Sequence, residues 1–244
     1  MYNSSMAEYD TDKYDLPSDM ADNGKLNALR AAVLGANDGI VSVSSVVMGV
    51  AGATSDSKAI SLAGLAALIA GALSMAVGEY VSVSSQSDAE KAYIRNEKED
   101  LENDPEGELE ELAREYVKHG VSPDLAKQVA IELTNKDGLK AHLRMHFNLD
   151  PEDINSPWQA ATASLLAFTL GGVIPFLTIV FAPESSRIVA TVGAVIVALF
   201  AVGYLSAKAG NANKVRATAR VVIGGVAAMV ITYGVGLLFG TTVG

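Results

Sequence analysis

The feature that most constrains this chain is a set of uncharged stretches, each long enough to cross a lipid bilayer. Four segments lack Asp, Glu, Lys and Arg: Ala59–Gly78, Pro157–Pro183, Ile188–Ala207 and Val221–Gly244. About 20 residues of α-helix cross a hydrocarbon core roughly 30 Å thick. A further segment nearer the N-terminus, Ala31–Ser55, is apolar except for Asn37 and Asp38. We therefore expect an all-α membrane protein with five transmembrane helices, the first of which also fits a buried amphipathic helix.

The composition excludes several classes of protein. Half of the 244 residues are hydrophobic, and the mean hydropathy of +0.27 is high for a soluble domain. No cysteine is present, which excludes disulfide frameworks, thiolate zinc sites and cysteine nucleophiles. The net charge of −10 argues against nucleic acid as a partner and fits cations better. Residues 1–24 carry six acidic side chains, and we expect them to form a disordered acidic tail.

The basic residues predict the orientation of the chain, because cytoplasmic loops of membrane proteins are enriched in Lys and Arg. With five spans, the N-terminal tail, the polar segment 80–156 and the turn near residues 208–220 lie on the same side. That side holds sixteen of the 18 basic residues, and the other holds only Lys58 and Arg187. We expect the N-terminus and the polar segment to be cytoplasmic and the C-terminus to lie outside.

The polar segment between the second and third spans is long enough to form a domain outside the membrane. Between Asp88 and Glu111 it contains eleven carboxylates and three basic residues. Asp-Pro and Ser-Pro pairs at residues 104–105 and 122–123 are typical helix starts, and Gly120 is a typical helix end. We expect three helices: the second span continuing to about Asn103, then Pro105–His119 and Pro123–Phe147. The predicted organisation is a tail at 1–24, transmembrane helices at 25–87, a cytoplasmic three-helix domain at 88–150 and transmembrane helices at 151–244.

The spacing of polar side chains on these three helices favours metal binding. Carboxylates are spaced i,i+3 in two pairs, Glu97 with Asp100 and Glu108 with Glu111. Like charges on one helix face repel each other unless a cation lies between them, and oxygen ligands suit a divalent ion. On the third helix His142 and His146 flank Met145, offering imidazole nitrogen and thioether sulfur to a transition metal. The alternative is a solvated acidic face with two surface histidines.

Ionisable side chains also occur within the spans. Asp38 lies inside the first span, and a carboxylate at membrane depth is costly unless it faces an ion, a partner or a cavity. Glu79 closes the second span with Met75 one helical turn before it, a pair that suits a borderline divalent ion. We expect all three to be metal ligands. The alternatives are a hydrogen bond within the Asn-Asp-Gly turn at residues 37–39 and simple packing of the methionine.

Two glycine pairs predict close helix packing. Gly35-x-x-x-Gly39 and Gly236-x-x-x-Gly240 are spacings that let helix backbones approach each other in a membrane. One five-helix chain offers few polar groups to line an ion path. We therefore expect a symmetric homodimer whose first spans meet near Gly35 and Gly39.

Two segments within the spans resemble the signatures of the vacuolar iron transporter family. They are Gly35-Ala-Asn-Asp-Gly-Ile-Val-Ser42 and Ser74-Met-Ala-Val-Gly-Glu-Tyr-Val-Ser82. Ser84-Ser-Gln-Ser-Asp88 and Pro105-Glu-Gly-Glu108 continue the match. The resemblance covers about residues 25–244, leaving only the acidic tail outside it.

This resemblance implies a five-helix protomer that dimerises, with the ion path along the dimer interface. The family moves Fe²⁺, and often Mn²⁺ and other divalent ions, out of the cytosol, in exchange for protons. Asp38 and Met75 match its translocation-path residues. Glu97, Glu108 and Glu111 match its metal-binding glutamates, with Asp100 in place of a fourth. Where the family offers Met and Glu on the third helix, this chain has His142, Met145 and His146, which leaves its metal preference open.

The leading hypothesis is a secondary transporter of divalent metal ions (Fe²⁺ and Mn²⁺, with Zn²⁺ as a further ligand) and not an enzyme. No prosthetic group is expected, and the expected partners are protons, a second copy of the chain and membrane lipid. The membrane would be the cell membrane in a prokaryote and the vacuolar membrane in a eukaryote. The rival is a membrane-anchored metal-binding or ferroxidase-like protein, which would not need Asp38 or five spans. No G-x-x-x-x-G-K-[ST] loop is present, which argues against an ATP-driven pump.

Overall fold

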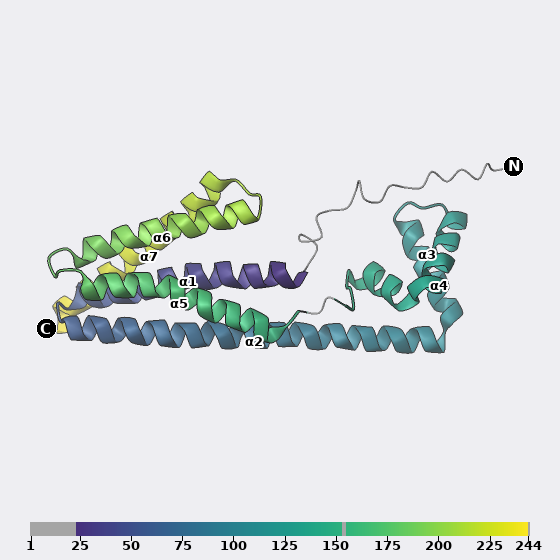
Figure 1. The fold of residues 1–244 in the computed structure, drawn as a ribbon, viewed down its shortest axis with the longest axis horizontal. Helices are drawn as coiled ribbons and strands as arrows, with labels where there is room; N and C mark the ends of the chain where they lie inside the picture. The colour runs from purple at the N-terminus through teal and green to yellow at the C-terminus, as the bar shows by residue number, and fades with distance from the viewer. Residues whose placement is uncertain (1–22, 153–154, 244) are drawn as a thin grey trace. The chain divides into compact units, whose positions relative to one another are not determined.

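The computed structural model describes residues 23–152 and 155–243, with the side chains of residues 29–152 and 155–240. The described residues form helices and connecting segments, with no strand among them (Figure 1). The helices are α1 (Asn23–Ala53), α2 (Ser57–Asn103), α3 (Pro105–Lys118), α4 (Pro123–Phe147), α5 (Pro157–Phe181), α6 (Arg187–Ala209) and α7 (Lys214–Val243). Of the expected acidic tail, residues 1–22 lie outside the described part.

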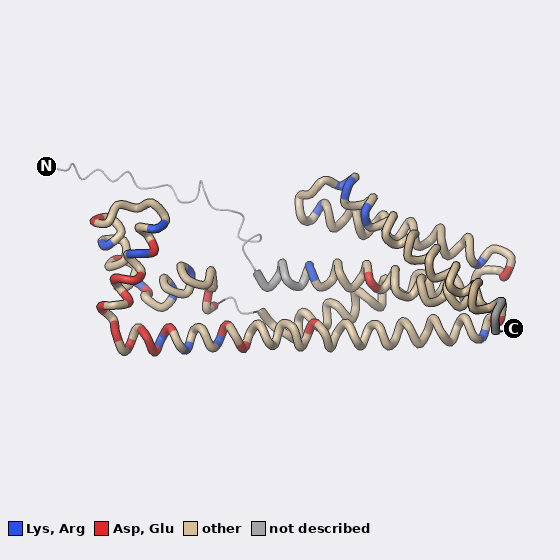
Figure 2. Tube along the Cα trace, turned by 180° about the vertical axis from the view of Figure 1, so that it is seen from behind, with Lys and Arg blue, Asp and Glu red and all other residues tan. Residues whose placement is uncertain are grey.

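Five of these helices are long and apolar enough to cross a membrane, which confirms the predicted number of spans. The candidate spans are Leu29–Ala53, Ser57–Asn103, Pro157–Phe181, Arg187–Ala209 and Lys214–Gly240. Lys, Arg, Asp and Glu are sparse along α5, α6 and α7 and dense along the end of α2 and in α3 (Figure 2). The helix bounds in the polar segment also agree with the prediction to within a residue.

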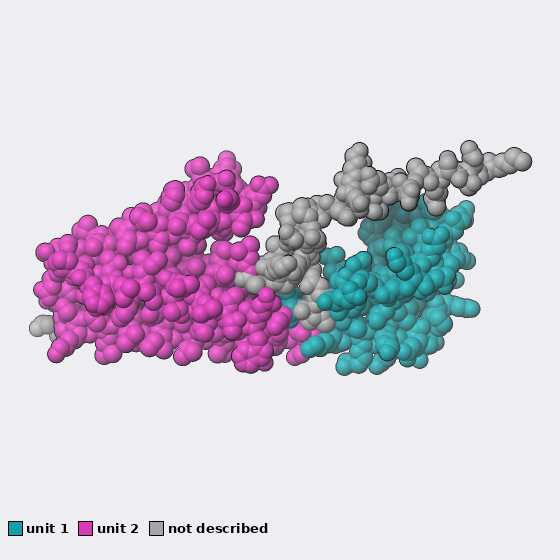
Figure 3. All heavy atoms as spheres, in the orientation of Figure 1, with its two compact units in different colours: residues 1–27, 90–155 teal, residues 28–89, 156–244 magenta. Residues whose placement is uncertain are grey.

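The chain divides into two compact units (Figure 3). The membrane unit comprises residues 28–89 and 156–244, and the insert unit comprises residues 1–27 and 90–155. Helix α2 contributes its first part to the membrane unit and its last part to the insert unit.

Helix α1 is central to the membrane unit, because two apolar clusters cover it on different faces. Val43 and Val47 belong to a cluster with Phe168 of α5 and residues of α2. Ile40 and Met48 belong to a second cluster with residues of α6 and α7. These two clusters hold α1 against α2 and α5 on one face and against α6 and α7 on another.

The glycine pairs pack within one chain. A Cβ atom at Gly39 would lie 2.2 Å from the carbonyl oxygen of Phe168, so α1 and α5 touch backbone to backbone there. A Cβ atom at Gly236 would lie 1.9 Å from the carbonyl oxygen of Gly49, which brings α7 equally close to α1. Close packing is therefore confirmed. Gly35 and Gly39 both contact α5 of the same chain, so the expected meeting of two first spans, which stays a prediction, would need other residues of α1.

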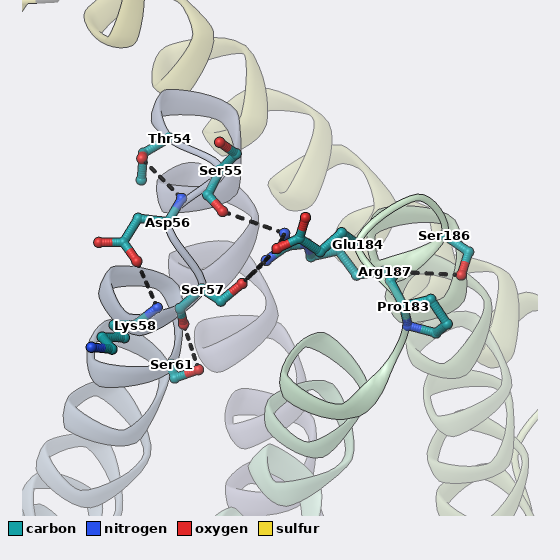
Figure 4. Close-up of polar contacts among 10 residues, drawn as sticks. All are labelled: Thr54, Ser55, Asp56, Ser57, Lys58, Ser61, Pro183, Glu184, Ser186 and Arg187. Atoms are coloured by element: carbon teal, nitrogen blue, oxygen red, sulfur yellow. Dashed lines mark hydrogen bonds and ion pairs between the residues drawn. The ribbon is translucent and has the colours of Figure 1, made fainter.

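A buried arginine joins two turns at one end of the membrane unit (Figure 4). Arg187 donates hydrogen bonds to the Ser57 hydroxyl (3.1 Å) and the Ser55 carbonyl (3.3 Å) in the α1–α2 turn. It also pairs with Glu184 at 3.1 Å, and Ser57 donates to the same carboxylate oxygen. This network satisfies a guanidinium that is only 7% exposed and fixes the α1–α2 turn against the α5–α6 turn.

Local capping explains the helices of the insert unit. The Asp104 side chain accepts a hydrogen bond from the Gly107 N–H at 3.0 Å and caps α3, and Gly120 after α3 has a positive φ of 93°. Helix α4 has the predicted bounds, Pro123–Phe147, but it is kinked inside them. Asp137 has non-helical backbone angles (φ −166°, ψ 86°), and its carboxylate accepts from the Lys140 N–H at 2.9 Å. Asp137 therefore acts as an N-cap for the second half of α4.

Candidate metal centre

Three helices of the insert unit bring one metal-ligating side chain each to a common point. Glu97 comes from the end of α2, Glu108 from α3 and His142 from the second half of α4, and their ligand atoms all lie within 4.8 Å of one another. The Nδ1 atom of His142 is 2.9 Å from Oε1 of Glu97 and 3.3 Å from Oε2 of Glu108. We call these three residues the metal triad.

The metal triad is buried and short of hydrogen bonds. His142 is 0% exposed and Glu97 is 7% exposed. Among the described residues, neither ring nitrogen of His142 nor Oε1 of Glu97 makes a hydrogen bond of acceptable geometry. A buried polar atom without a partner costs about 1–3 kcal/mol. Converging lone pairs left without partners are the arrangement that a cation would satisfy.

Electrostatics favours the ligating form of the histidine. Burial lowers the pKa of His142 and outweighs the nearby Glu97, which raises it. The imidazole is therefore neutral near pH 7 and has a lone pair to offer. Burial also raises the pKa of Glu108, and the carboxylates of Glu111 and Glu97 raise it further. Crowded, partly desolvated carboxylates of this kind are relieved by a bound cation.

A second pair adjoins the metal triad. The Nδ1 atom of His146 lies 3.7 Å from Oε1 of Glu111, and the rings of His142 and His146 stack with centroids 5.5 Å apart. The Nε2 atom of His146 is buried and makes no hydrogen bond within the described residues. The predicted ligands Glu111 and His146 therefore lie beside the triad rather than in it.

The other two predicted ligands of the insert unit are placed differently. Asp100 is exposed, and its negative charge contributes to the raised pKa of Glu108. Met145 lies in the wall of a separate cavity of about 310 Å³ with Tyr116, Leu133 and Lys140. The structure thus selects three of the seven predicted ligands as a cluster.

In the membrane unit, Asp38 is half-buried within the unbroken helix α1. Its Oδ1 atom accepts a hydrogen bond from the Ser42 hydroxyl one turn along, at 2.6 Å. The alternative of a local Asn-Asp-Gly turn is wrong, because residues 37–39 are helical. Because the Ser42 hydroxyl binds Oδ1, the Oδ2 atom of Asp38 is the oxygen that an ion could bind.

Glu79 and Met75 lie one turn apart on α2. Glu79 is buried and pairs with Arg30 of α1, with Nη2 and Oε2 3.1 Å apart. Met75 is half-buried and packs against the cluster of Val43 and Phe168. The carboxylate that was expected to hold a metal therefore has a guanidinium as its partner in this structure.

Sequence reasoning missed two residues at these carboxylates. Ser42 follows Asp38 by four residues, a spacing that predicts a hydrogen bond along one helix face. Arg30 is separated from Glu79 by 49 residues, and no local pattern links the two. Only the packing of α1 on α2 reveals that pair.

Comparison with known proteins gives a consistent result. A model of the VIT family matches residues 29–237. The vacuolar iron transporter of Acanthamoeba castellanii (strain ATCC 30010 / Neff) is 43% identical over 216 residues, which are 88% of this chain and 80% of that protein. The vacuolar iron transporter homolog 3 of Arabidopsis thaliana is 40% identical over 214 residues, or 87% of this chain and 84% of that protein. The vacuolar iron transporter homolog 2 of Oryza sativa subsp. japonica is 38% identical over 214 residues, or 87% of this chain and 91% of that protein. All three relatives are named as transporters or transporter homologues, and none is named as an enzyme.

Proposed function

The chain belongs to the VIT family, and from that premise we propose that it exports Fe²⁺ from the cytosol across the membrane in which it sits, in exchange for protons. Mn²⁺ is the proposed second substrate, and Zn²⁺ a further ligand. The relatives named as vacuolar iron transporters and the five apolar helices support transport. The observation that carries the metal assignment is the metal triad, whose buried lone pairs converge without hydrogen bonds.

We propose that the insert unit collects metal on the cytoplasmic side. Neutral imidazole and carboxylate together suit a borderline transition ion better than Mg²⁺ or Ca²⁺, which prefer oxygen ligands alone. Glu97, Glu108 and His142 are the proposed inner ligands. Glu111 and His146 extend the site, and Asp100 and Met145 are the proposed outermost contributors.

Within the membrane unit, Asp38 is the proposed transit ligand. A buried carboxylate can alternate between a metal-bound form and a neutral, protonated form without leaving a bare charge at membrane depth. Such alternation would couple outward metal movement to inward proton movement. Met75 and Glu79 are the proposed entry ligands, and metal binding at Glu79 would displace its ion pair with Arg30.

We further propose that two copies assemble as a symmetric dimer through α1. On α1, Leu34 and Val46 are 46% and 40% exposed and are available to a partner, whereas Gly35 and Gly39 are not. The proposed orientation places the N-terminus and the insert unit in the cytoplasm and the C-terminus outside. In a eukaryote the proposed membrane is vacuolar, and in a prokaryote it is the cell membrane.

A metal transporter and a membrane-anchored ferroxidase should give different results in sealed liposomes. Purified protein is reconstituted, Fe²⁺ is added outside, and internal metal and pH are followed with trapped fluorescent indicators. A metal–proton exchanger moves metal inward and protons outward together, with Mn²⁺ giving a smaller response of the same sign. A membrane-anchored ferroxidase would oxidise external Fe²⁺ without either movement, and that result would reject the proposal.

A further inference from the structure

We propose that the turn between α6 and α7 is a docking surface for the headgroups of anionic phospholipids. Its cationic residues are Lys208, Lys214, Arg216 and Arg220. We call these four residues the basic turn. The proposal does not depend on which ion the protein transports.

The position of the basic turn follows from the fold. Helices α6 and α7 are both candidate membrane spans, and only residues 210–213 connect them. A connection this short between two spanning helices must lie at the surface of the bilayer. The basic turn therefore faces lipid headgroups on whichever side of the membrane it occupies.

Within the described residues, no acidic side chain neutralises the charge of this surface. All four basic side chains are exposed, and Glu184 is the last acidic residue in the sequence. In the part of the chain that the structure describes, no carboxylate lies within ion-pair distance of any of the four. Figure 2 shows Lys and Arg at this turn without Asp or Glu beside them. In a protein with a net charge of −10, such a patch stands out as a surface that can attract an anion.

The basic turn is held on a rigid support. A Cβ atom at Gly203 would lie 2.9 Å from the Cα atom of Thr218, so α6 and α7 are in backbone contact near the turn. Asn213 caps α7 by accepting from the Arg216 N–H at 3.1 Å. The Lys214 ammonium lies 5.5 Å from the centroid of the Tyr204 ring, a cation–π contact. A preformed surface loses little entropy when it binds a headgroup.

Exposed apolar side chains accompany the charges on both helices. Leu205 of α6 and Val215 and Ile223 of α7 are 61%, 79% and 68% exposed. Cations next to exposed apolar side chains match the headgroup and acyl chain of a lipid molecule. Anionic lipid fits this arrangement better than a soluble phosphate, which has no apolar part.

The test measures the thermal stability of the purified full-length protein in a neutral detergent. Phosphatidylglycerol or phosphatidylcholine is added at equal concentration, and Tm is recorded for each. We expect phosphatidylglycerol to raise Tm more than phosphatidylcholine, because a ligand of the folded state stabilises it. Replacing all four residues of the basic turn by Gln should remove roughly two thirds or more of that difference, as should high salt.

The controls separate a docking surface from a general effect of charge. A matched variant replaces four exposed basic residues of the insert unit by Gln (Lys91, Arg114, Lys127 and Lys136) and should keep the full phosphatidylglycerol effect. The charge-conserving variant Lys208→Arg/Lys214→Arg should also keep it, and inorganic phosphate should not reproduce it. The proposal is overturned if the two quadruple variants lose the phosphatidylglycerol effect on Tm equally. It is also overturned if the variant of the basic turn keeps the full effect. If the quadruple variant does not fold, Lys208→Gln/Lys214→Gln must still reduce the effect, and an unchanged effect in that pair overturns the proposal as well.

Discussion

The Nδ1 atom of His142 lies 2.9 Å from Oε1 of Glu97, yet neither atom makes a hydrogen bond in the described part of the chain. Because burial keeps His142 neutral, this contact is not a strong ion pair and leaves a carboxylate short of positive charge. A divalent cation bound by these residues would supply that charge. Metal binding at this site would therefore raise the stability of the insert unit.

The first prediction concerns His142→Leu. This change removes a buried polar ring whose two nitrogens lack partners, so the metal-free protein should be at least as stable as the wild type. Metal binding should weaken at least tenfold, or about 1.4 kcal/mol. Thermal melts with and without Mn²⁺ or Zn²⁺ measure both effects. His119→Leu is the matched control, because His119 is exposed and lies outside the metal triad. Equal metal affinity of the wild type and His142→Leu would contradict the proposal that the metal triad binds metal.

The second prediction concerns the carboxylates of α3. Glu108→Gln/Glu111→Gln should abolish the rise in Tm that transition metals produce, since it removes one triad ligand and the partner of His146. Transport in liposomes should slow without stopping, because the membrane carboxylates remain. Glu106→Gln/Glu110→Gln removes the same charge from exposed positions of the same helix and should leave both measurements unchanged. Normal metal response in the first variant would make the insert unit a structural cap.

The third prediction concerns pH and Asp150, which follows α4. Burial raises the pKa of this carboxyl, but hydrogen bonds from Arg144, the Glu152 N–H and Lys140 lower it to about 2. Because the folded-state pKa is below the ordinary 3.8, the ionised form stabilises the fold above that pH, and this contribution is lost as pH falls toward 2. Asp150→Asn should therefore lower the free energy of unfolding at pH 7 and converge with the wild type near pH 2. Chemical denaturation across this range tests it, with Asp88→Asn as an exposed control that should follow the wild type throughout.

The helices of this protein could be predicted from sequence because their signals are local. Asp104-Pro105 and Gly120 mark their own boundaries, and the structure agrees with them. The break at Asp137 could not be predicted, because a single glycine inside a long helical pattern, as at residue 138, is weak evidence for a break. Sequence spacing named the three triad residues among seven candidates, but it could not select them. Selection depends on where α2, α3 and α4 meet, which is also why Arg30 and Glu79 could not be paired in advance.

The fourth prediction concerns Ser42, which donates to Asp38 at 2.6 Å. Asp38→Asn should abolish metal uptake while the protein stays folded, because an amide cannot alternate between a charged and a neutral form. Ser42→Ala frees the Asp38 carboxylate from its orienting bond and should raise the KM for metal several-fold, and Ser42→Thr should restore it. Ser44→Ala is the matched control, since Ser44 is buried on the same helix and donates to the Val41 carbonyl instead. Wild-type transport by Asp38→Asn would remove Asp38 from the ion path.

The last prediction concerns the dimer, and the absence of cysteine makes it a clean crosslinking experiment. Gly35 and Gly39 are poor sites for new cysteines, because any Cβ there would strike α5 of the same chain. Leu34→Cys and Val46→Cys place thiols on exposed positions of α1 and should give dimers on mild oxidation in native membranes. Val189→Cys, on a 75% exposed position of α6, tests for random collision and should stay monomeric. Efficient crosslinking through α6 with none through α1 would place the dimer interface elsewhere, and the two copies of Asp38 would then not share one path.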